Sequence, residues 1–442
     1  MNVITNICTI GTKSVKYINK LLLYRRISDN VPALNEESFV GRIVHYLNDY
    51  NKTNNDKVNV TPTPEIGNIL KNLKANRINT LNNLKEKQIE ELLLALRTPT
   101  GVINWQFRKI IDVIDDECCS RINVWDISSL LKLLNVYVQV IPCQVATNKF
   151  FHTALTHISK YIQYLNREEI LQFVFYVGLP KGKSKSKQAM LKACLKQLTS
   201  NDIRTLSIEE LCIICNATFR SSTKISNGTI LEKIREMLNE NLYLLRDPAL
   251  LVTLIKTVRH NRYQDDDLLN TLSCAIMFNR TIESYNFMTL CHVMALFVDY
   301  GFYHGTLLKL YLNECLKYLK TDVSENWQHR PEEIRPKDIT RFLWILSTLG
   351  YDDDCGIFEE IVVPTIVRKI ERGAYENDTE ELINSVLYLW MLDYQAVALL
   401  PIIFTQENVD IVKGKSSRHV IFDNFSVAWE FQFAFISRSC QN

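Results

Sequence analysis

Apolar residues recur at helical spacing in the stretch RPKDITRFLWILSTLGY, which covers residues 335–351. Five of them occupy positions i, i+3, i+4, i+7 and i+10 of one helical face, namely Ile339, Phe342, Leu343, Leu346 and Leu349. Pro336 suits a first helical turn, Asp338 complements the positive end of the helix dipole, and Gly350 allows a left-handed stop. The pattern therefore predicts an amphipathic helix with a defined start and end.

Similar patterns recur along the chain at a nearly constant interval. Eight predicted first helices start at Asn83, Asp126, Asn166, Ser207, Asp247, Ser284, Pro336 and Asp378, at successive spacings of 43, 40, 41, 40, 37, 52 and 42 residues. Most starts carry an N-cap residue, and several have an acid two or three positions later. A second amphipathic pattern follows each first helix, for example in residues 147–162, 228–245, 304–319 and 356–370.

Helix pairs of about 40 residues cannot bury their apolar faces alone and are stabilised by stacking. The sequence therefore predicts an all-α fold, an α-solenoid of helix-turn-helix hairpins whose inner surface is an extended binding face. An unrelated helical bundle is the alternative. The chain has only 13 Gly and 11 Pro in 442 residues, which argues against an all-β protein because such folds need frequent turn residues.

The patterns divide the chain into five predicted segments. Residues 51–66 are rich in Asn and Thr and lack helical periodicity, and the polar run KTDVSENWQHRPEEIRP in the longest interval is interpreted as a loop. The expected segments are a targeting segment and lead-in at 1–40, a partly flexible N-terminal region at 41–82, a helical-repeat array at 83–330, a further helical segment at 331–412 and an irregular tail at 413–442.

The first 28 residues are basic and contain no acid, with the first carboxylate at Asp29. The cations of this segment are Lys13, Lys16, Lys20, Arg25 and Arg26. They alternate with apolar residues, as is typical of a mitochondrial transit peptide. We therefore expect localisation in the mitochondrial matrix, with an ordinary basic first helix as the alternative. A secretory signal fits poorly because lysines interrupt each apolar run.

No membrane span or disulfide framework is expected. The most apolar stretch, residues 386–404, is interrupted by Asp393, Gln395 and Pro401, so two short buried helices with a turn between them explain it better than a span. The 12 Cys are scattered, as expected for a reducing compartment. Cys212 and Cys215 form a C-x-x-C without a second pair, which favours buried thiols over a metal or redox site.

Catalytic motifs are missing from the sequence. It contains no Gly-x-Gly-x-x-Gly, His-Glu-x-x-His or Gly-x-Ser-x-Gly pattern. GLPKGKS at 178–184 is one residue short of a phosphate loop and follows a predicted helix instead of a strand. The acid runs at 265–267 and 352–354 are interpreted as solvated acids at helix N-termini, with a metal site as the alternative. We therefore expect neither an enzyme nor a cofactor.

Net charge is only +2, so any affinity for nucleic acid must come from a local basic surface. The candidate is residues 180–198, which lack acids and contain Lys181, Lys183, Lys185, Lys187, Lys192 and Lys196. Lysines on a loop that leads into a helix N-terminus can bind phosphates, although a solvated loop explains them equally simply. The KGKSSR stretch at 413–418 is a weaker second basic patch.

A second candidate lies on the helix predicted at 336–349, where Lys337, Arg341 and Trp344 share a face distinct from the leucine face. A cation beside an aromatic ring suits single-stranded RNA, through phosphate contact and base stacking. The same three side chains could instead pack against the next repeat.

RPKDITRFLWILSTLGY resembles a helix of the FAST kinase domain-containing family, which has an Arg-Pro-x-Asp start, and residues 267–316 and 383–404 look similar to the helices around it. The resemblance implies mitochondrial RNA-binding proteins that control processing, stability or translation of organelle transcripts, without implying kinase activity. Family members continue into a second conserved segment and a C-terminal RAP domain with a nuclease-like fold. FDNFSVAWEFQFAFISRSCQN, which ends at Asn442, resembles neither, so we expect this chain to lack RAP and transfer no catalytic residue.

The sequence thus favours a non-catalytic mitochondrial protein that holds single-stranded mitochondrial RNA on a basic, aromatic-bearing face and works with other RNA-processing proteins. A helical scaffold that binds proteins in the matrix is the competing hypothesis, favoured by the small net charge. A metal-dependent nuclease would require the acid runs to converge with a lysine.

Overall fold

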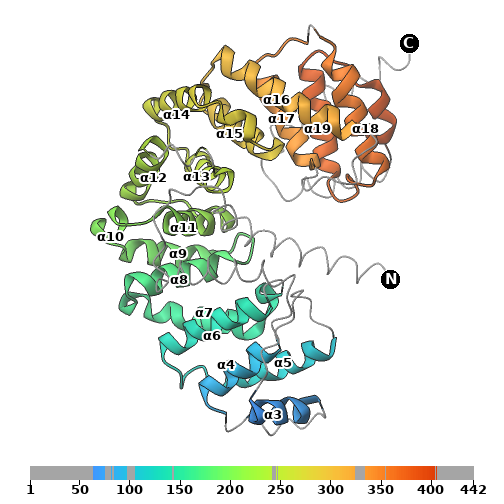
Figure 1. Cartoon of the computed structure of the whole chain (residues 1–442). Helices are drawn as coiled ribbons and strands as arrows, with labels where there is room; N and C mark the ends of the chain where they lie inside the picture. Colours follow the sequence, from blue (N-terminus) through green and yellow to red (C-terminus); the bar gives the residue numbers. More distant parts are fainter. Residues whose placement is uncertain are drawn as a thin grey trace. The chain divides into compact units, whose positions relative to one another are not determined.

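The structure is a computed structural model that describes residues 63–74, 84–96, 105–141, 144–240, 247–323, 334–353 and 355–403, together with Leu81, Leu245 and Thr405. Within these residues every regular element is helical and no strand occurs, which confirms the predicted all-α helical repeat (Figure 1). The predicted transit peptide, the tail at 413–442 with its KGKSSR patch, and most of the polar run after residue 323 lie outside the described residues.

The chain divides into two compact units, and the first covers residues 1–276. Its successive first helices pack each against the next, α4 on α6, α6 on α8, α8 on α11 and α11 on α13. These helices are α4 (Glu86–Ala95), α6 (Ile127–Val140), α8 (Arg167–Gly178), α11 (Ile208–Arg220) and α13 (Pro248–Asn261). Neighbour-to-neighbour packing of this kind is what a stack of repeats requires.

Among the second helices of this unit, α5 packs on α7, and α12 packs on the first helix α13. The second helices are α5 (Trp105–Ser120), α7 (Lys149–Ile158), α9 (Lys185–Gln197), α12 (Gly228–Glu240) and α14 (Asp266–Phe278), with the short turns η3 (Val145–Thr147), η4 (Ser159–Tyr164) and α10 (Ser200–Arg204) between them. An additional helix, α3 (Pro64–Lys74), packs on α4 and α5 through buried Ile66, Ile69 and Leu73. It begins inside the Asn/Thr-rich stretch for which no helix was expected.

The second unit, residues 277–442, repeats the arrangement. Here α15 packs on both α16 and α17, α17 packs on α19, and α16 packs on α18. Its elements are η6 (Thr281–Ser284), α15 (Phe287–Asp299), α16 (Gly305–Val323), α17 (Pro336–Thr348), the π-helical turn η8 (Phe358–Val362), α18 (Val363–Glu371), α19 (Thr379–Met391), η9 (Val397–Leu399) and α20 (Leu400–Ile403). The stretch 386–404 is thus two short helical segments separated by a turn, as expected.

Local caps explain why the first helices begin where they do. The Asn166 and Ser207 side chains each accept the N–H of the residue three positions on, and Glu169 and Glu210 bond back in a reciprocal capping box. Two predicted starts are shifted, because α15 begins after Asn286, whose side chain caps Thr289 N–H, and α4 begins after Lys85.

Five first helices end in the same left-handed turn. A residue one or two positions after the helix has a positive φ in each case, at Ser222, Arg262, Gly301, Gly350 and Asp393. After α17, for example, the Tyr351 N–H donates to the Leu346 carbonyl at 3.0 Å and the Gly350 N–H to the Ser347 carbonyl at 3.3 Å. These two bonds satisfy carbonyls that the helix end leaves open, so the predicted stop at Gly350 is confirmed.

The buried surface of the first helices is wider than a single apolar stripe. On α17 the predicted face is buried at Ile339, Phe342 and Leu346, but Ile345 is fully buried as well, because α15 and α19 flank the helix. Leu349, predicted as part of that face, is only half-buried because it is the C-cap residue.

The C-x-x-C pair lies inside α11, where Cys212 and Cys215 are fully buried free thiols, in agreement with the simpler interpretation. Burial raises the pKa of Cys215 to about 12 and the pKa of Cys212 as well, so both thiols stay protonated. No helix among the described residues is long and apolar enough to cross a membrane.

Candidate nucleic-acid interface

Residues 179–184 connect α8 to α9 and are here called the lysine loop. This loop is fastened to the end of α11. The Arg220 guanidinium donates to the Gly178 carbonyl at 2.8 Å and to the Leu179 carbonyl, two groups that the end of α8 leaves open. In return, the Gly182 N–H donates to the Arg220 carbonyl at 3.3 Å. The loop is therefore held at both its start and its middle by the neighbouring repeat.

The predicted lysines of this region differ in their exposure. Lys181, Lys183 and Lys185 are exposed, and so is Lys192 further along α9. Lys187 is half-buried and donates to the Pro180 carbonyl at 3.3 Å, and burial, followed by the Arg220 charge, lowers its pKa. Lys187 thus bonds back to the start of the loop, while Lys181, Lys183 and Lys185 are exposed to solvent.

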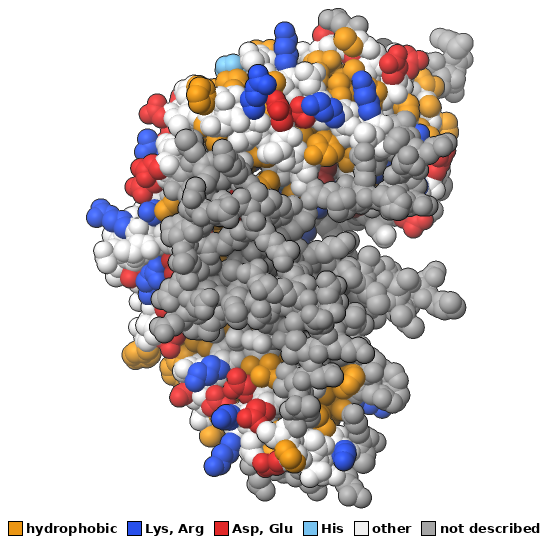
Figure 2. Space-filling view, in the orientation of Figure 1, with side chains coloured by type: hydrophobic (Ala, Val, Ile, Leu, Met, Phe, Trp, Pro, Cys, Tyr) orange, Lys and Arg blue, Asp and Glu red, His pale blue; other side chains and the backbone are white. Residues whose placement is uncertain are grey.

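Two neighbouring loops extend this basic surface, and the sequence analysis did not identify them. The basic edge, as we define it, comprises residues 179–187, 219–228 and 256–264, which contain no Asp or Glu. Its additional cations are Arg220, Lys224, Lys256, Arg259 and Arg262. The face drawn in Figure 2 mixes Lys and Arg with Asp and Glu over the described residues.

Side chains tie the three loops of the basic edge to one another. The Gln188 amide donates to the Ser221 and Ser222 carbonyls at 3.2 and 2.9 Å, which joins the first loop to the second. The Ile225 N–H donates to the Asn261 side chain at 2.7 Å, which joins the second loop to the third. The edge is therefore a continuous, braced surface within the first unit.

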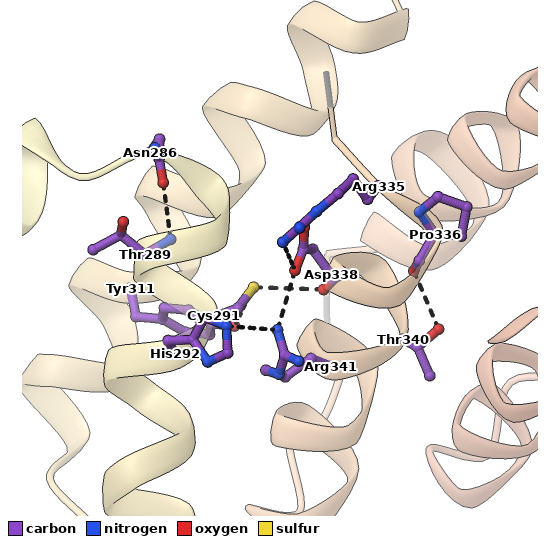
Figure 3. A network of polar contacts seen from close by, with 10 residues as sticks. All are labelled: Asn286, Thr289, Cys291, His292, Tyr311, Arg335, Pro336, Asp338, Thr340 and Arg341. Atoms are coloured by element: carbon purple, nitrogen blue, oxygen red, sulfur yellow. Dashed lines mark hydrogen bonds and ion pairs between the residues drawn. The ribbon is translucent and has the colours of Figure 1, made fainter. Parts of the chain in front are cut away.

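The second predicted site, on α17, is organised around a buried carboxylate. Asp338 is 1% exposed and accepts from Arg335 Nε at 2.6 Å, Arg335 Nη2 at 2.9 Å and Arg341 Nη1 at 3.1 Å (Figure 3). Arg341 Nη1 also lies 3.4 Å from His292 Nε2 on α15. A buried carboxylate is costly unless it is paired, so the two arginines are what allow Asp338 to be buried.

This arrangement separates the three predicted residues of α17. Lys337 is exposed, whereas Arg341 and Trp344 are half-buried, and the Arg341 side chain is 22% exposed. The guanidinium of Arg341 is directed at Asp338 and at α15, which is a structural role within the unit. RNA contact by Lys337, Arg341 and Trp344 stays a prediction.

The two acid runs supply caps at helix starts. Asp265 accepts the Leu268 N–H at 2.8 Å and pairs with Arg235 at 2.7 Å, and Asp353 accepts two N–H groups at the start of the next helix. Both acid runs thus match the interpretation as helix N-terminal acids. The described residues contain no group of His, Cys, Asp or Glu side chains arranged to hold a metal ion.

A pocket of about 210 Å³ in the first unit lies beside another such cap. Its lining includes Arg108, Asp112, Asp115, Gln144 and Lys149. Asp115 is 4% exposed and accepts the N–H groups at the start of α7, at 3.0 to 3.1 Å. Burial raises the pKa of Asp115, and these hydrogen bonds partly offset that rise. The structural role of Asp115 is to cap α7.

The similarity to known proteins agrees with the resemblance stated from the sequence. A human mitochondrial protein is a distant relative. The chain is 22% identical over 298 residues to "FAST kinase domain-containing protein 5, mitochondrial" of Homo sapiens, a match that covers 66% of this chain. The matched part spans 35% of that relative's length. No family model matches the chain.

Proposed function

We propose that the chain is an RNA-binding protein of the mitochondrial matrix that supports processing, stability or translation of organelle transcripts without chemistry of its own. The observation that carries the proposal is the basic edge, formed by loops of three successive repeats that contain no Asp or Glu of their own, with Glu232 accepting from Tyr263 at its margin. The distant relative, which is named as mitochondrial, supports the compartment. Other RNA-processing proteins would be its partners.

The basic edge would bind RNA chiefly through its phosphates. Its exposed cations are Lys181, Lys183, Lys185, Lys224 and Arg262. Each cation that neutralises a phosphate releases a counterion, so the affinity for a single strand falls with salt. If all five take part, the logarithm of affinity should fall with the logarithm of salt concentration with a slope of about −3.5.

The test is fluorescence anisotropy with a labelled single-stranded RNA of about 12 nucleotides, long enough to span an extended site. The double variant Lys181→Glu/Lys183→Glu should weaken binding at least tenfold and reduce the slope. The matched control Lys71→Glu/Lys87→Glu reverses two exposed charges on α3 and α4, outside the edge, and should bind like the wild type. Absent binding, or binding that does not fall with salt, would overturn the proposal.

A helical scaffold for other proteins is the alternative, and the mixed charges of the face in Figure 2 favour it. It predicts that the wild-type chain captures matrix proteins after nuclease treatment and gives no salt-dependent anisotropy change with RNA. The same anisotropy experiment therefore separates the two functions.

A further inference from the structure

A large apolar ring is exposed in the middle of the basic edge. Phe219, in the last turn of α11, is 40% exposed although most phenylalanines of the described residues are buried. It directly precedes Arg220. The Arg220 carbonyl accepts the N–H of Gly182, which lies between Lys181 and Lys183 in the sequence. In sequence, Phe219 is thus one residue from the point where the lysine loop is fastened to α11.

The neighbouring repeat holds this ring in place. The Lys256 ammonium lies 5.9 Å from the ring centroid, and the His260 ring meets it edge-on at 5.9 Å and 82°. Both come from α13, which is fixed to α11 by the Thr257 hydroxyl donating to the Cys215 carbonyl at 3.3 Å. Burial and the Lys224 charge lower the pKa of His260, which favours its uncharged ring.

We propose that Phe219 is a stacking platform for one unpaired nucleobase of a single-stranded nucleic acid, whose flanking phosphates lie against Lys181, Lys183 and Lys224. The inference rests on the proposed function and names the part of the surface that distinguishes single strands from duplexes. Every base offers a π-face, so the platform selects for unpaired bases without selecting a sequence. In a duplex those faces are stacked on each other and unavailable to a surface ring.

The ionic and stacking contributions can be separated by their response to salt. Stacking a base on an aromatic side chain contributes about 1–3 kcal/mol, so Phe219→Ala should weaken binding of the single strand roughly tenfold or more. Because the ring carries no charge, the salt slope should stay that of the wild type. Lys181→Glu/Lys183→Glu should change the slope as well as the affinity.

Two further variants control for changes in folding. Phe219→Leu keeps an apolar side chain against α13 but removes the flat π-face, so it should bind as weakly as Phe219→Ala while its thermal midpoint matches the wild type. Phe219→Tyr keeps the face and should bind like the wild type. Equal binding by wild type and Phe219→Leu would overturn the platform.

The probes are a single-stranded RNA and a single-stranded DNA of about 12 nucleotides, their duplex, and an abasic sugar-phosphate strand of equal length. Phe219→Ala should lose affinity for both base-bearing single strands and should match the wild type on the duplex and the abasic strand. An equal loss on the abasic strand would overturn the stacking role. If the wild-type chain binds none of the probes, the proposed function itself fails, which is a distinct result from salt-dependent binding that ignores Phe219.

Discussion

A glycine lies at the contact between α8 and α11 in the first unit. A Cβ on Gly178 would lie 2.7 Å from the Cβ and 2.8 Å from the Cα of Ala217, where carbon atoms normally stay 3.5–4.0 Å apart. In Gly178→Ala, α8 and α11 must therefore separate by about 1 Å. Alanine gains up to about 1 kcal/mol in helix propensity, but overpacking costs about 1–3 kcal/mol.

The separation also stretches the bond from Arg220 to the Gly178 carbonyl, which is worth about 1 kcal/mol. We therefore expect Gly178→Ala to lower the free energy of unfolding by about 2 kcal/mol, because these losses exceed the propensity gain. Urea denaturation followed by circular dichroism measures this as a lower midpoint.

The matched control for this substitution is Gly67→Ala in α3. A Cβ there meets nothing within 4 Å, so only the propensity gain of up to about 1 kcal/mol applies. The two substitutions are chemically identical and should shift the midpoint in opposite directions. If Gly178→Ala were as stable as the wild type, α8 and α11 could separate without loss of free energy of unfolding. That result would refute the reasoning.

Three further outcomes are expected. Asp338→Asn leaves two guanidinium groups without their buried partner and should cost about 3 kcal/mol in a urea titration, whereas a cost below about 0.5 kcal/mol would contradict the pairing. Burial raises the pKa of Asp247, so its contribution to the free energy of unfolding is present below the unfolded pKa of about 3.9 and is lost as pH rises through the folded pKa. Asp247→Asn keeps the cap and should flatten that loss. An unchanged dependence of the free energy of unfolding on pH would contradict this prediction. Exposed Cys274 and Cys355 should be alkylated in the native protein, and buried Cys212 only on unfolding, as peptide mass spectrometry would show.

Helix starts were predictable because the groups that define them are close in sequence. The caps at Asn166 and Ser207 each involve residues three positions apart, so the letters alone indicate them. The repeat interval likewise followed from recurring local patterns. The start shifted at Asn286, whose side chain caps α15, and at Lys85, after which α4 begins.

The basic edge could not be predicted in the same way, since its loops are about 40 residues apart and meet only through stacking of the repeats. An alignment of the repeats on their helix ends places Gly178, Arg220 and Arg262 at equivalent positions. It also shows that cations are frequent around these positions. The pairing of Arg341 depends on the burial of Asp338 against α15, which no spacing within α17 indicates. The helical pattern correctly placed Arg341 away from the leucine face, yet it could not tell a solvent-facing cation from a paired one.

The left-handed turns at the ends of five first helices bear on how such a surface can diversify. Their closing bonds join backbone groups, so the side chains beside them are not needed to make the turn. Serine and arginine occupy two of these positions and glycine others, at similar backbone angles. A substitution next to one turn can therefore alter the surface of that repeat while the helices beneath keep their register, so the repeats can diversify one at a time.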